Sequence, residues 1–358
     1  MFKQVVVGMS GGVDSSVAAY LLKEQGYEVQ CIFMKNWEDE DDEFYCSSEE
    51  DYNDALQVCD LLNLPLHSVN FSKEYRENVF KYFLEEYKSG RTPNPDVLCN
   101  KEIKFKFFME YALKLGADAI ATGHYARINK SIDGFQLLKG IDKNKDQSYF
   151  LYLLGQIELS KTLFPIGEMN KSEVRGLAEK INLPNARKKD STGICFIGER
   201  DFKAFLQQYL PTQPGNIITT NGNAVGQHDG LMYYTLGQRK GIGVGGGHGT
   251  TEEPWYVVKK DLDNNQLVIG QGHDHPNLYS RNIKAGQLHL ITSAPSIPFE
   301  CTAKIRYRQK DQGCTIISIK NGIASINFYE DQFAPTPGQS IVFYDSDQCL
   351  GGGIIETV

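Results

Sequence analysis

The chain of 358 residues lacks several patterns that would place it at once in a class of proteins. No apolar run approaches the roughly 18 residues that a membrane helix needs. The N-terminus, MFKQVVVGMSGG, has a short valine run in place of the long apolar core of a signal peptide. Internal repeats and low-complexity tracts are also missing. We therefore expect a cytoplasmic protein that does not bind a membrane.

Zinc-ribbon spacing is missing too, because none of the eight cysteines forms a CxxC pair. We expect no fixed metal site in the protein and mostly reduced thiols in the cytoplasm. The net charge of −8 excludes a uniformly basic surface. A local basic surface for nucleic acid stays compatible with this charge, because phosphate binding depends on where the basic groups cluster.

Strand and helix patterns alternate through the first part of the chain. Short apolar segments at 3–9, 28–34, 65–71 and 118–125 indicate strands, and periodic segments at 14–25, 49–62, 73–87 and 102–115 indicate helices. This alternation predicts a parallel sheet with helices on both faces, and ligands bind such sheets at the C-terminal ends of the strands. From about residue 209, turn-rich and then short alternating segments predict β structure.

We therefore predict an α/β protein with three domains. Residues 1–208 would form a parallel-sheet domain with a helical extension. Residues 209–280 would form a small mixed or β central domain, and residues 281–358 a C-terminal antiparallel β-barrel.

A glycine loop, SGGVDS, joins the first expected strand to the first expected helix. Glycines let the backbone approach an anion, and a helix N-terminus favours phosphate. A tight turn with Asp14 as helix cap explains the position equally well. The loop lacks the Gly-Lys-Ser/Thr of a Walker A motif and the spacing of a dinucleotide-binding loop.

In this strand–loop–helix setting, SGGVDS resembles the PP-loop of ATP pyrophosphatases, enzymes of the adenine nucleotide α-hydrolase-like fold. The resemblance implies that ATP is cleaved between its α- and β-phosphates, which leaves an adenylated substrate and pyrophosphate. For Met34 alone, plain core packing is the competing interpretation. The nucleotide-binding positions that the resemblance implies are Gly8, Met9, Ser10, Gly11, Gly12, Val13, Asp14, Ser15, Met34 and Gly123.

Two cysteines stand in segments with unusual neighbours. Cys99 lies in GRTPNPDVLCNKEIKFK, where two prolines argue against regular structure and the next helix is expected to begin close to Cys99. A helix N-terminus and two nearby lysines, Lys101 and Lys104, would favour the thiolate, and Asp96 is a candidate proton carrier. Cys195 lies in a polar loop, KKDSTGICFIGERDF. An inert buried thiol is the alternative for either cysteine.

Longer blocks carry a closer resemblance, namely PNPDVLCN, KDQSYFL, KKDSTGICFIGERDF, GLMYYTLGQRKG, EEPWYVV and TPGQS…CLGGGIIE. They resemble the bacterial tRNA-specific 2-thiouridylase family over essentially the whole chain. The resemblance implies ATP- and Mg²⁺-dependent adenylation of the C2 carbonyl of the wobble uridine, then sulfur transfer to give 2-thiouridine, AMP and pyrophosphate. It further implies Cys99 as nucleophile and Cys195 as persulfide carrier, which form a transient disulfide. Asn94, Pro95 and Asp96 would lie beside the target base.

The same resemblance implies a tRNA surface and a protein that donates sulfur, such as a cysteine desulfurase or a sulfur-relay protein. The target uridine would be flipped out of its stack, and Tyr307 would stack on a base of the anticodon loop. Basic residues also form four clusters, at 101–106, 187–189, 239–240 and 306–310. The implied tRNA-contacting positions are His124, Lys145, Asp146, Gln147, Arg306, Tyr307 and Gln339.

Three alternatives stay open from the sequence. Another PP-loop enzyme, either an amide-forming synthetase or a different tRNA thiolase, would share the glycine loop, but a synthetase would not need the two cysteines. A non-catalytic tRNA-binding protein could keep a relic nucleotide site. Asp96, Cys99 and Cys195 could instead ligate an iron–sulfur cluster.

Overall fold

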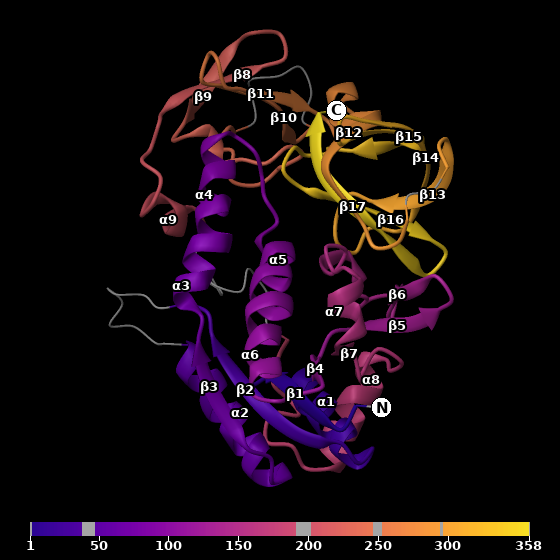
Figure 1. Cartoon of the computed structure of the whole chain (residues 1–358). Coiled ribbons are helices and arrows are strands. Elements are labelled where there is room, and N and C mark those ends of the chain that lie inside the picture. Colours follow the sequence, from indigo (N-terminus) through magenta and orange to yellow (C-terminus); the bar gives the residue numbers. More distant parts are fainter. Residues whose placement is uncertain (1, 38–46, 191–201, 246–252, 294–295, 358) are drawn as a thin grey trace.

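A parallel sheet forms the base of the molecule in the computed structural model, which describes residues 2–37, 47–190, 202–245, 253–293 and 296–357 (Figure 1). Its strands follow the order β3-β2-β1-β4-β7, and neighbouring strands run parallel. The strands are β1 (Gln4–Met9), β2 (Glu28–Lys35), β3 (Leu66–Asn70), β4 (Ala119–Ala121) and β7 (Thr162–Leu163). The parallel α/β sheet predicted from the sequence is thereby confirmed.

Two layers of helices cover the sheet, because successive side chains of a strand point to opposite faces. Val5 and Val7 of β1 pack in one core with α1 (Val13–Glu24), α2 (Ser47–Leu62) and α8 (Lys171–Lys180). Val6 packs in the other core with two helical stretches, 72–88 and 95–114, each made of consecutive α- and π-helical elements. These are α3 (Ser72–Tyr75), η1 (Arg76–Phe80), α4 (Lys81–Lys88), α5 (Pro95–Leu98), η2 (Cys99–Phe107) and α6 (Phe108–Lys114).

The helix around Cys99 starts earlier than the sequence analysis expected. α5 begins at Pro95 and continues without a break through the π-helical stretch η2 into α6. Pro95 occupies the first helical position, where proline is favoured because its fixed φ suits a helix and no backbone N–H is required. The prediction that these prolines exclude regular structure is therefore wrong, because Pro95 starts the helix. Cys99 lies in its second turn and is 1% exposed.

The central part of the chain is a small mixed sheet in the order β10-β11-β8-β9. β8 and β11 run parallel, and the other pairs are antiparallel. The elements are α9 (Phe202–Gln207), β8 (Gly215–Thr219), β9 (Ala224–His228), η4 (Leu231–Tyr233), β10 (Trp255–Asp261), β11 (Gln266–Gln271) and η5 (Pro276–Leu278).

The last part of the chain closes into an antiparallel barrel. Its strands follow the order β12-β15-β14-β13-β16-β17, and pairing of β12 with β17 completes the ring. The strands are β12 (Tyr279–Leu290), β13 (Phe299–Lys304), β14 (Gln312–Lys320), β15 (Ile323–Phe333), β16 (Ser340–Asp345) and β17 (Gln348–Thr357). The predicted fold class is therefore confirmed in all three parts.

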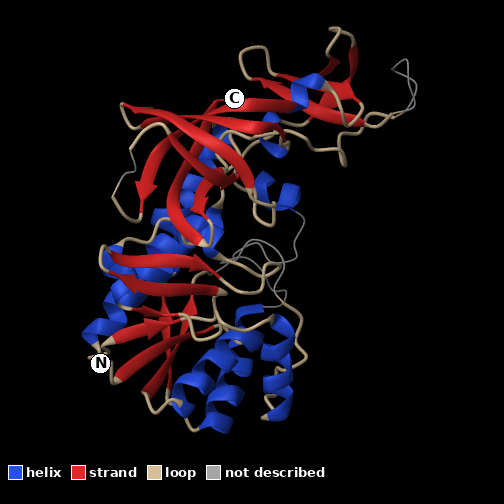
Figure 2. Ribbon diagram, turned by 90° about the vertical axis from the view of Figure 1, so that its right-hand side faces the viewer, coloured by secondary structure: helices blue, strands red, loops and turns tan. Residues whose placement is uncertain are grey.

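One hairpin of the first part joins the barrel, which the sequence did not reveal. β5 (Ala126–Ser131) and β6 (Gly134–Lys139) pair with each other, and β6 also pairs with β17. Figure 2 shows the parallel sheet and its helices at one end of the molecule and the β structure at the other. The connection to α8 includes η3 (Ser148–Phe150) and α7 (Gln156–Ser160). Within the described ranges, no helix has the length and apolar character needed to cross a membrane.

Candidate active site

The glycine loop lies at the C-terminal end of β1, where parallel sheets bind their ligands. Gly12 is the extended N-cap of α1, and the first N–H groups of a helix have no acceptor within it. Gly11 has φ +74° and so needs glycine. A Cβ on Gly12 would meet only the Ser10 hydroxyl, at 3.4 Å. Among the described residues, little packs against Gly12, so an anion could approach the N-terminus of α1.

Hydrogen bonds fix the loop from within and from behind. The Ser10 N–H donates to Ser15 Oγ (3.2 Å), and Ser15 Oγ donates to the Gly12 carbonyl (3.1 Å). The buried Asn185 amide donates to the Gly11 carbonyl and to Ser16 Oγ, each at 2.9 Å. These bonds hold the loop in its conformation without using the amides of the first turn of α1.

The other two predicted nucleotide positions lie against this loop. A Cβ on Gly123, just after β4, would stand 2.6 Å from the Ser15 nitrogen and 2.7 Å from the Asp14 carbonyl carbon. The end of the Met34 side chain would be 3.1 Å from a Cβ on Gly8. The structure therefore brings Gly8, Gly123 and Met34 together with the loop.

A network of ion pairs surrounds Asp14 beside the loop. Lys171 Nζ lies 2.8 Å from both carboxylate oxygens of Asp14 and 2.7 Å from Asp190 Oδ1. Asp190 also pairs with Lys145 (2.5 Å) and Arg175 (3.0 Å). Three cations thus face these two carboxylates, although Asp142, which accepts the Lys171 N–H, and Asp51, whose backbone borders Gly11, add negative charge close by. The cations of this network are the groups that could contact a polyphosphate.

Two titratable groups of this region have shifted pKa values. Burial raises the pKa of Asp190, but hydrogen bonds from Lys145 and Lys171 outweigh it and hold that pKa at about 2. Burial first and the Asp14 carboxylate second raise the pKa of Tyr125, whose hydroxyl donates to Asp14 Oδ1 at 2.7 Å. Asp190 is therefore ionised and Tyr125 protonated at neutral pH.

The predicted sulfur-chemistry residues lie on the α5–η2 helix. Asp96 is in its first turn and Cys99 begins the π-helical stretch η2. Residues three apart lie on one face of a helix, so these two side chains are neighbours. Such π-helical turns are frequent at functional sites. Cys195, its segment and the implied disulfide with Cys99 lie outside the described residues.

His124 is buried instead of exposed on a surface. Its Nδ1 lies 2.8 Å from Thr122 Oγ1, and its ring packs against Phe105 and Phe164. Burial first, and the charge of Lys104 second, hold the pKa of His124 well below its ordinary value of 6.5. The imidazole is therefore neutral at physiological pH and suited to hydrogen bonding, not to pairing with a phosphate.

Several other residues implied as tRNA contacts hold the protein together. Asp146 Oδ1 accepts the N–H groups of Gly140 (3.2 Å) and Ser148 (3.1 Å). Gln147 Oε1 accepts the Tyr125 N–H at 3.0 Å. Asp146 and Gln147 therefore fix the turn that carries Lys145, and they do so from the interior side.

Arg306 and Gln339 meet at a different place, between the central sheet and the barrel. Both line a cavity of about 300 Å³ together with Thr235, Leu236, Gln238 and Thr336. Arg306 donates to the Ala334 carbonyl at 2.8 Å, and burial lowers its pKa. Nearby, the centre of the Tyr307 ring lies 4.4 Å from the centre of the Phe150 ring. Arg306 and Gln339 form a second group, whereas Tyr307 lies close enough to Asp146 and Lys145 for their charges to act on its hydroxyl.

The basic clusters expected to bind phosphate are partly neutralised in the protein. Lys106 pairs with Glu102 at 2.7 Å. Lys188 pairs with Asp51 at 2.7 Å and contacts Asp54. The fold brings acidic residues beside these lysines, which the clusters in the sequence do not show.

Sequence reasoning missed Lys171, Asp190 and Asn185 as site residues. Each is a single polar residue far along the chain from the glycine loop. α8 packs on α1, and this packing brings Lys171 and the segment after α8 near Asp14. A local motif could not have identified them.

Family models match three consecutive parts of the chain. Residues 3–199 match the description "tRNA methyl transferase HUP domain", residues 203–271 "tRNA methyl transferase PRC-barrel domain", and residues 280–355 "Aminomethyltransferase beta-barrel domain".

Curated relatives match over nearly their whole length and are called tRNA-specific 2-thiouridylase MnmA. The relative from Proteus mirabilis is 59% identical, covering 99% of this chain and 97% of the relative. That from Serratia proteamaculans is 59% identical with coverages of 99% and 97%. The relative from Pseudomonas savastanoi pv. phaseolicola is 58% identical with coverages of 99% and 94%.

Proposed function

The chain belongs to the tRNA-specific 2-thiouridylase family, and from this premise we propose the reaction that its site performs. The protein is a tRNA sulfurtransferase: it uses ATP to activate the C2 carbonyl of the wobble uridine and replaces the oxygen with sulfur. Full-length identity of 58–59% to the relatives is the observation that carries the conclusion. The roles of individual residues below are our proposals.

ATP binds at the glycine loop in this proposal. The N-terminus of α1, the positive φ of Gly11 and the cations paired with Asp14 and Asp190 fit a polyphosphate. Gly123 permits the close approach of its segment to the start of α1. Mg²⁺ would come bound to the ATP phosphates, without a fixed protein site, and would neutralise their charge.

The activation step makes a poor leaving group into a good one. The uridine O2 attacks the α-phosphorus of ATP, its bond to phosphorus forms, and pyrophosphate leaves. Backbone amides of the loop stabilise the developing phosphate charge. The product carries AMP on O2, so C2 becomes open to a sulfur nucleophile.

Sulfur would come from a persulfide on Cys195, loaded by a separate sulfur-donor protein. In one route the terminal sulfur attacks C2 and AMP leaves with the oxygen. The Cys99 thiolate then attacks the Cys195 sulfur, which frees 2-thiouridine and forms a Cys99–Cys195 disulfide. In the other route Cys99 first releases the terminal sulfur as sulfide, which then attacks C2. Either route needs a cellular dithiol to reopen the disulfide.

Asp96 fits the role of a proton carrier for Cys99, because both lie on one face of the helix. Cys99 is 1% exposed, so its reaction requires that tRNA binding uncover the thiol. We propose that Asn94 and Pro95, at the start of α5, line the place of the flipped base. We propose that the protein acts in the cytoplasm, where tRNA and reducing dithiols are available.

tRNA would approach from the face that joins the sheet domain to the β domains. Lys145 near the glycine loop, and Arg306 and Gln339 at the 300 Å³ cavity, are the residues that we propose to contact it. Asp146 and Gln147 would act by holding Lys145. His124 and Tyr307 would bind through hydrogen bonding and stacking.

The test is tRNA-dependent release of pyrophosphate from ATP. We expect release with unmodified tRNA whose wobble base is uridine and little release with the same tRNA carrying cytidine at that position. Equal release with both tRNAs would count against activation at the wobble uridine. Release without tRNA would favour an amide-forming synthetase.

A further inference from the structure

The segment Gly90–Asn94 connects α4 to the helix that carries Asp96 and Cys99 (Figure 1). Residues of the central part of the chain hold its start. Lys260 Nζ donates to the Gly90 carbonyl at 3.0 Å. Gly90 has φ +71°, and a Cβ there would stand 2.6 Å from a methyl group of Leu262. The Thr92 hydroxyl lies 3.5 Å from that of Thr235. Contacts with the central part of the chain, not with the parallel sheet, therefore fix the start of this segment.

The barrel holds the middle of the same segment through one turn, Pro337–Gln339. The Thr92 N–H donates to the Pro337 carbonyl at 2.9 Å. Gln339 Nε2 donates to the Thr92 carbonyl at 2.7 Å and to the Pro93 carbonyl at 3.2 Å. The turn thus binds both peptide groups that precede Asn94.

Gly338 lets this turn approach so closely. It has φ +93°, and a Cβ there would stand 2.8 Å from the Thr92 nitrogen and 2.9 Å from the Thr92 oxygen. Both are backbone atoms, which a rotamer change cannot move aside. A salt bridge between Arg91 and Glu356 of β17 flanks the contact.

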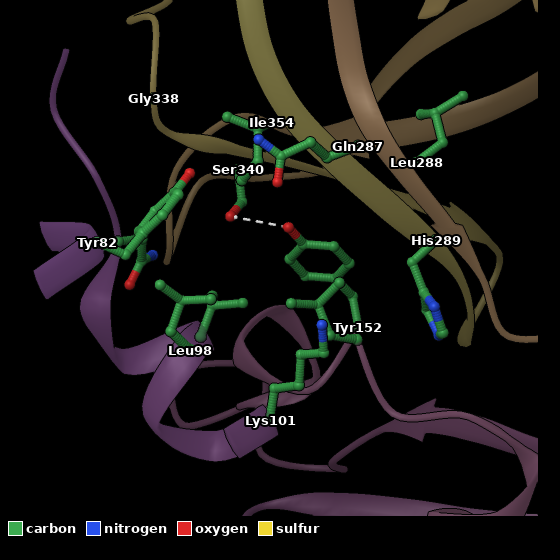
Figure 3. A pocket seen from close by; sticks show the side chains of 13 residues that line it. Tyr82, Leu98, Lys101, Tyr152, Gln287, Leu288, His289, Gly338, Ser340 and Ile354 are labelled. Atoms are coloured by element: carbon green, nitrogen blue, oxygen red, sulfur yellow. Dashed lines mark hydrogen bonds between the residues drawn. The ribbon is translucent and has the colours of Figure 1, made fainter. Parts of the chain in front are cut away.

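The segment is not a helix or strand, so these contacts position it. Its end at Asn94 borders a cavity of about 290 Å³, which Lys101, Tyr152, Gly338 and Ser340 also line (Figure 3). Asn94 therefore has open space on the side of this cavity, and close packing does not fix Asn94 there. Pro95 starts the helix directly afterwards, so this segment leads straight into the turns that carry Asp96 and Cys99.

We propose that the Pro337–Gln339 turn of the barrel is a positioning element for sulfur transfer, which holds Thr92 and Pro93 and so sets where Asp96 and Cys99 stand relative to bound tRNA. This inference rests on the proposed function. Gln339 also lines the cavity beside Arg306. The anchor of the segment is thus part of the surface proposed for tRNA, and docking of tRNA there adjusts the helix that reacts with it.

The test compares Gly338→Ala with Gly322→Ala in the full-length protein. Gly322 lies in another turn of the same barrel and also has positive φ (+75°), but a Cβ there meets nothing within 4 Å. The two variants share backbone strain and differ in the contact with Thr92. We expect G338A to lower kcat for thiolation about 10- to 100-fold, the scale of a small misplacement of reacting groups. KM for tRNA should stay within about twofold, and G322A should match the wild type.

Three results would overturn the inference: full kcat in G338A, equal losses in G338A and G322A, or a rise in tRNA Kd that accounts for the whole loss. If G338A does not fold, Glu356→Gln replaces it, with Glu356→Asp as the conservative variant. We then expect lower kcat at unchanged tRNA Kd for E356Q and recovery in E356D, and the absence of both effects would refute the inference. A wild-type protein that does not thiolate tRNA would refute the proposed function instead.

Discussion

Adding one methyl group at Gly123 should weaken ATP binding, because it would force apart two segments that border the glycine loop. In Gly123→Ala the new Cβ would lie 2.6 Å from the Ser15 nitrogen and 2.7 Å from the Asp14 carbonyl carbon. Non-bonded heavy atoms rest at about 3.5–4.0 Å. Both neighbours are backbone atoms, so the start of α1 or the segment after β4 must move by roughly 1 Å.

The size of the effect follows from what this movement disturbs. Overpacking of a well-packed site costs about 1–3 kcal/mol of folding free energy. Moving the Ser15 N–H away from a phosphate oxygen would remove a hydrogen bond to a charged group, worth about 1.5–3 kcal/mol. We therefore expect the Kd for ATP to rise roughly 10- to 150-fold, while tRNA affinity stays close to that of the wild type.

Gly176→Ala is the matched control, because Gly176 lies within α8 and a Cβ there meets nothing within 4 Å. This change should stabilise the fold by about 0.5–1 kcal/mol and leave ATP affinity unchanged. Calorimetric titration with a non-hydrolysable ATP analogue and thermal unfolding give both quantities. An unchanged ATP affinity in G123A, or an equal loss in G176A, would refute the reasoning.

Three further predictions concern other parts of the site. Cys99→Ser should abolish thiolation but keep tRNA-dependent pyrophosphate release. The control Cys349→Ser, at another buried cysteine, should keep both activities. Loss of pyrophosphate release together with thiolation in C99S would contradict separate roles for activation and sulfur transfer. Asn185→Ala removes the donor to the Gly11 carbonyl and should cost about 1–3 kcal/mol of stability and weaken ATP binding, so unchanged calorimetry and unfolding would count against it. The pKa of His124 is lowered in the folded protein, so the free energy of unfolding should fall as the pH drops below 6.5, by up to about 1.4 kcal/mol per pH unit. Urea unfolding at several pH values should show a flatter slope in His124→Gln. An equal slope in both proteins would exclude His124 as its source.

The fold could be predicted from local patterns because each element carries its own signal. The valines of β1 alternate between two cores, and glycines mark the turn into α1. The start of the Cys99 helix was missed because a proline can either break a helix or begin one. The division of the chain at residues 209 and 281 stays a prediction, as do the roles of the site residues.

The surroundings of the site could not be predicted, because they depend on contacts between distant segments. Lys171 reaches Asp14 across 157 positions and Gln339 reaches Thr92 across 247. No spacing rule relates such pairs. The resemblance implies Gln339 as a tRNA contact, which stays a prediction, and it gave no sign that the Gln339 amide holds the segment before Asp96.

The central claim joins ATP activation to the replacement of oxygen by sulfur at one base. Mass analysis of anticodon fragments tests it directly, after unmodified tRNA has been incubated with the protein, ATP, Mg²⁺ and a persulfide donor. We predict that the wobble uridine becomes heavier by the difference between sulfur and oxygen, and only when ATP is present. An unchanged wobble uridine, with every component active in separate controls, would contradict the account.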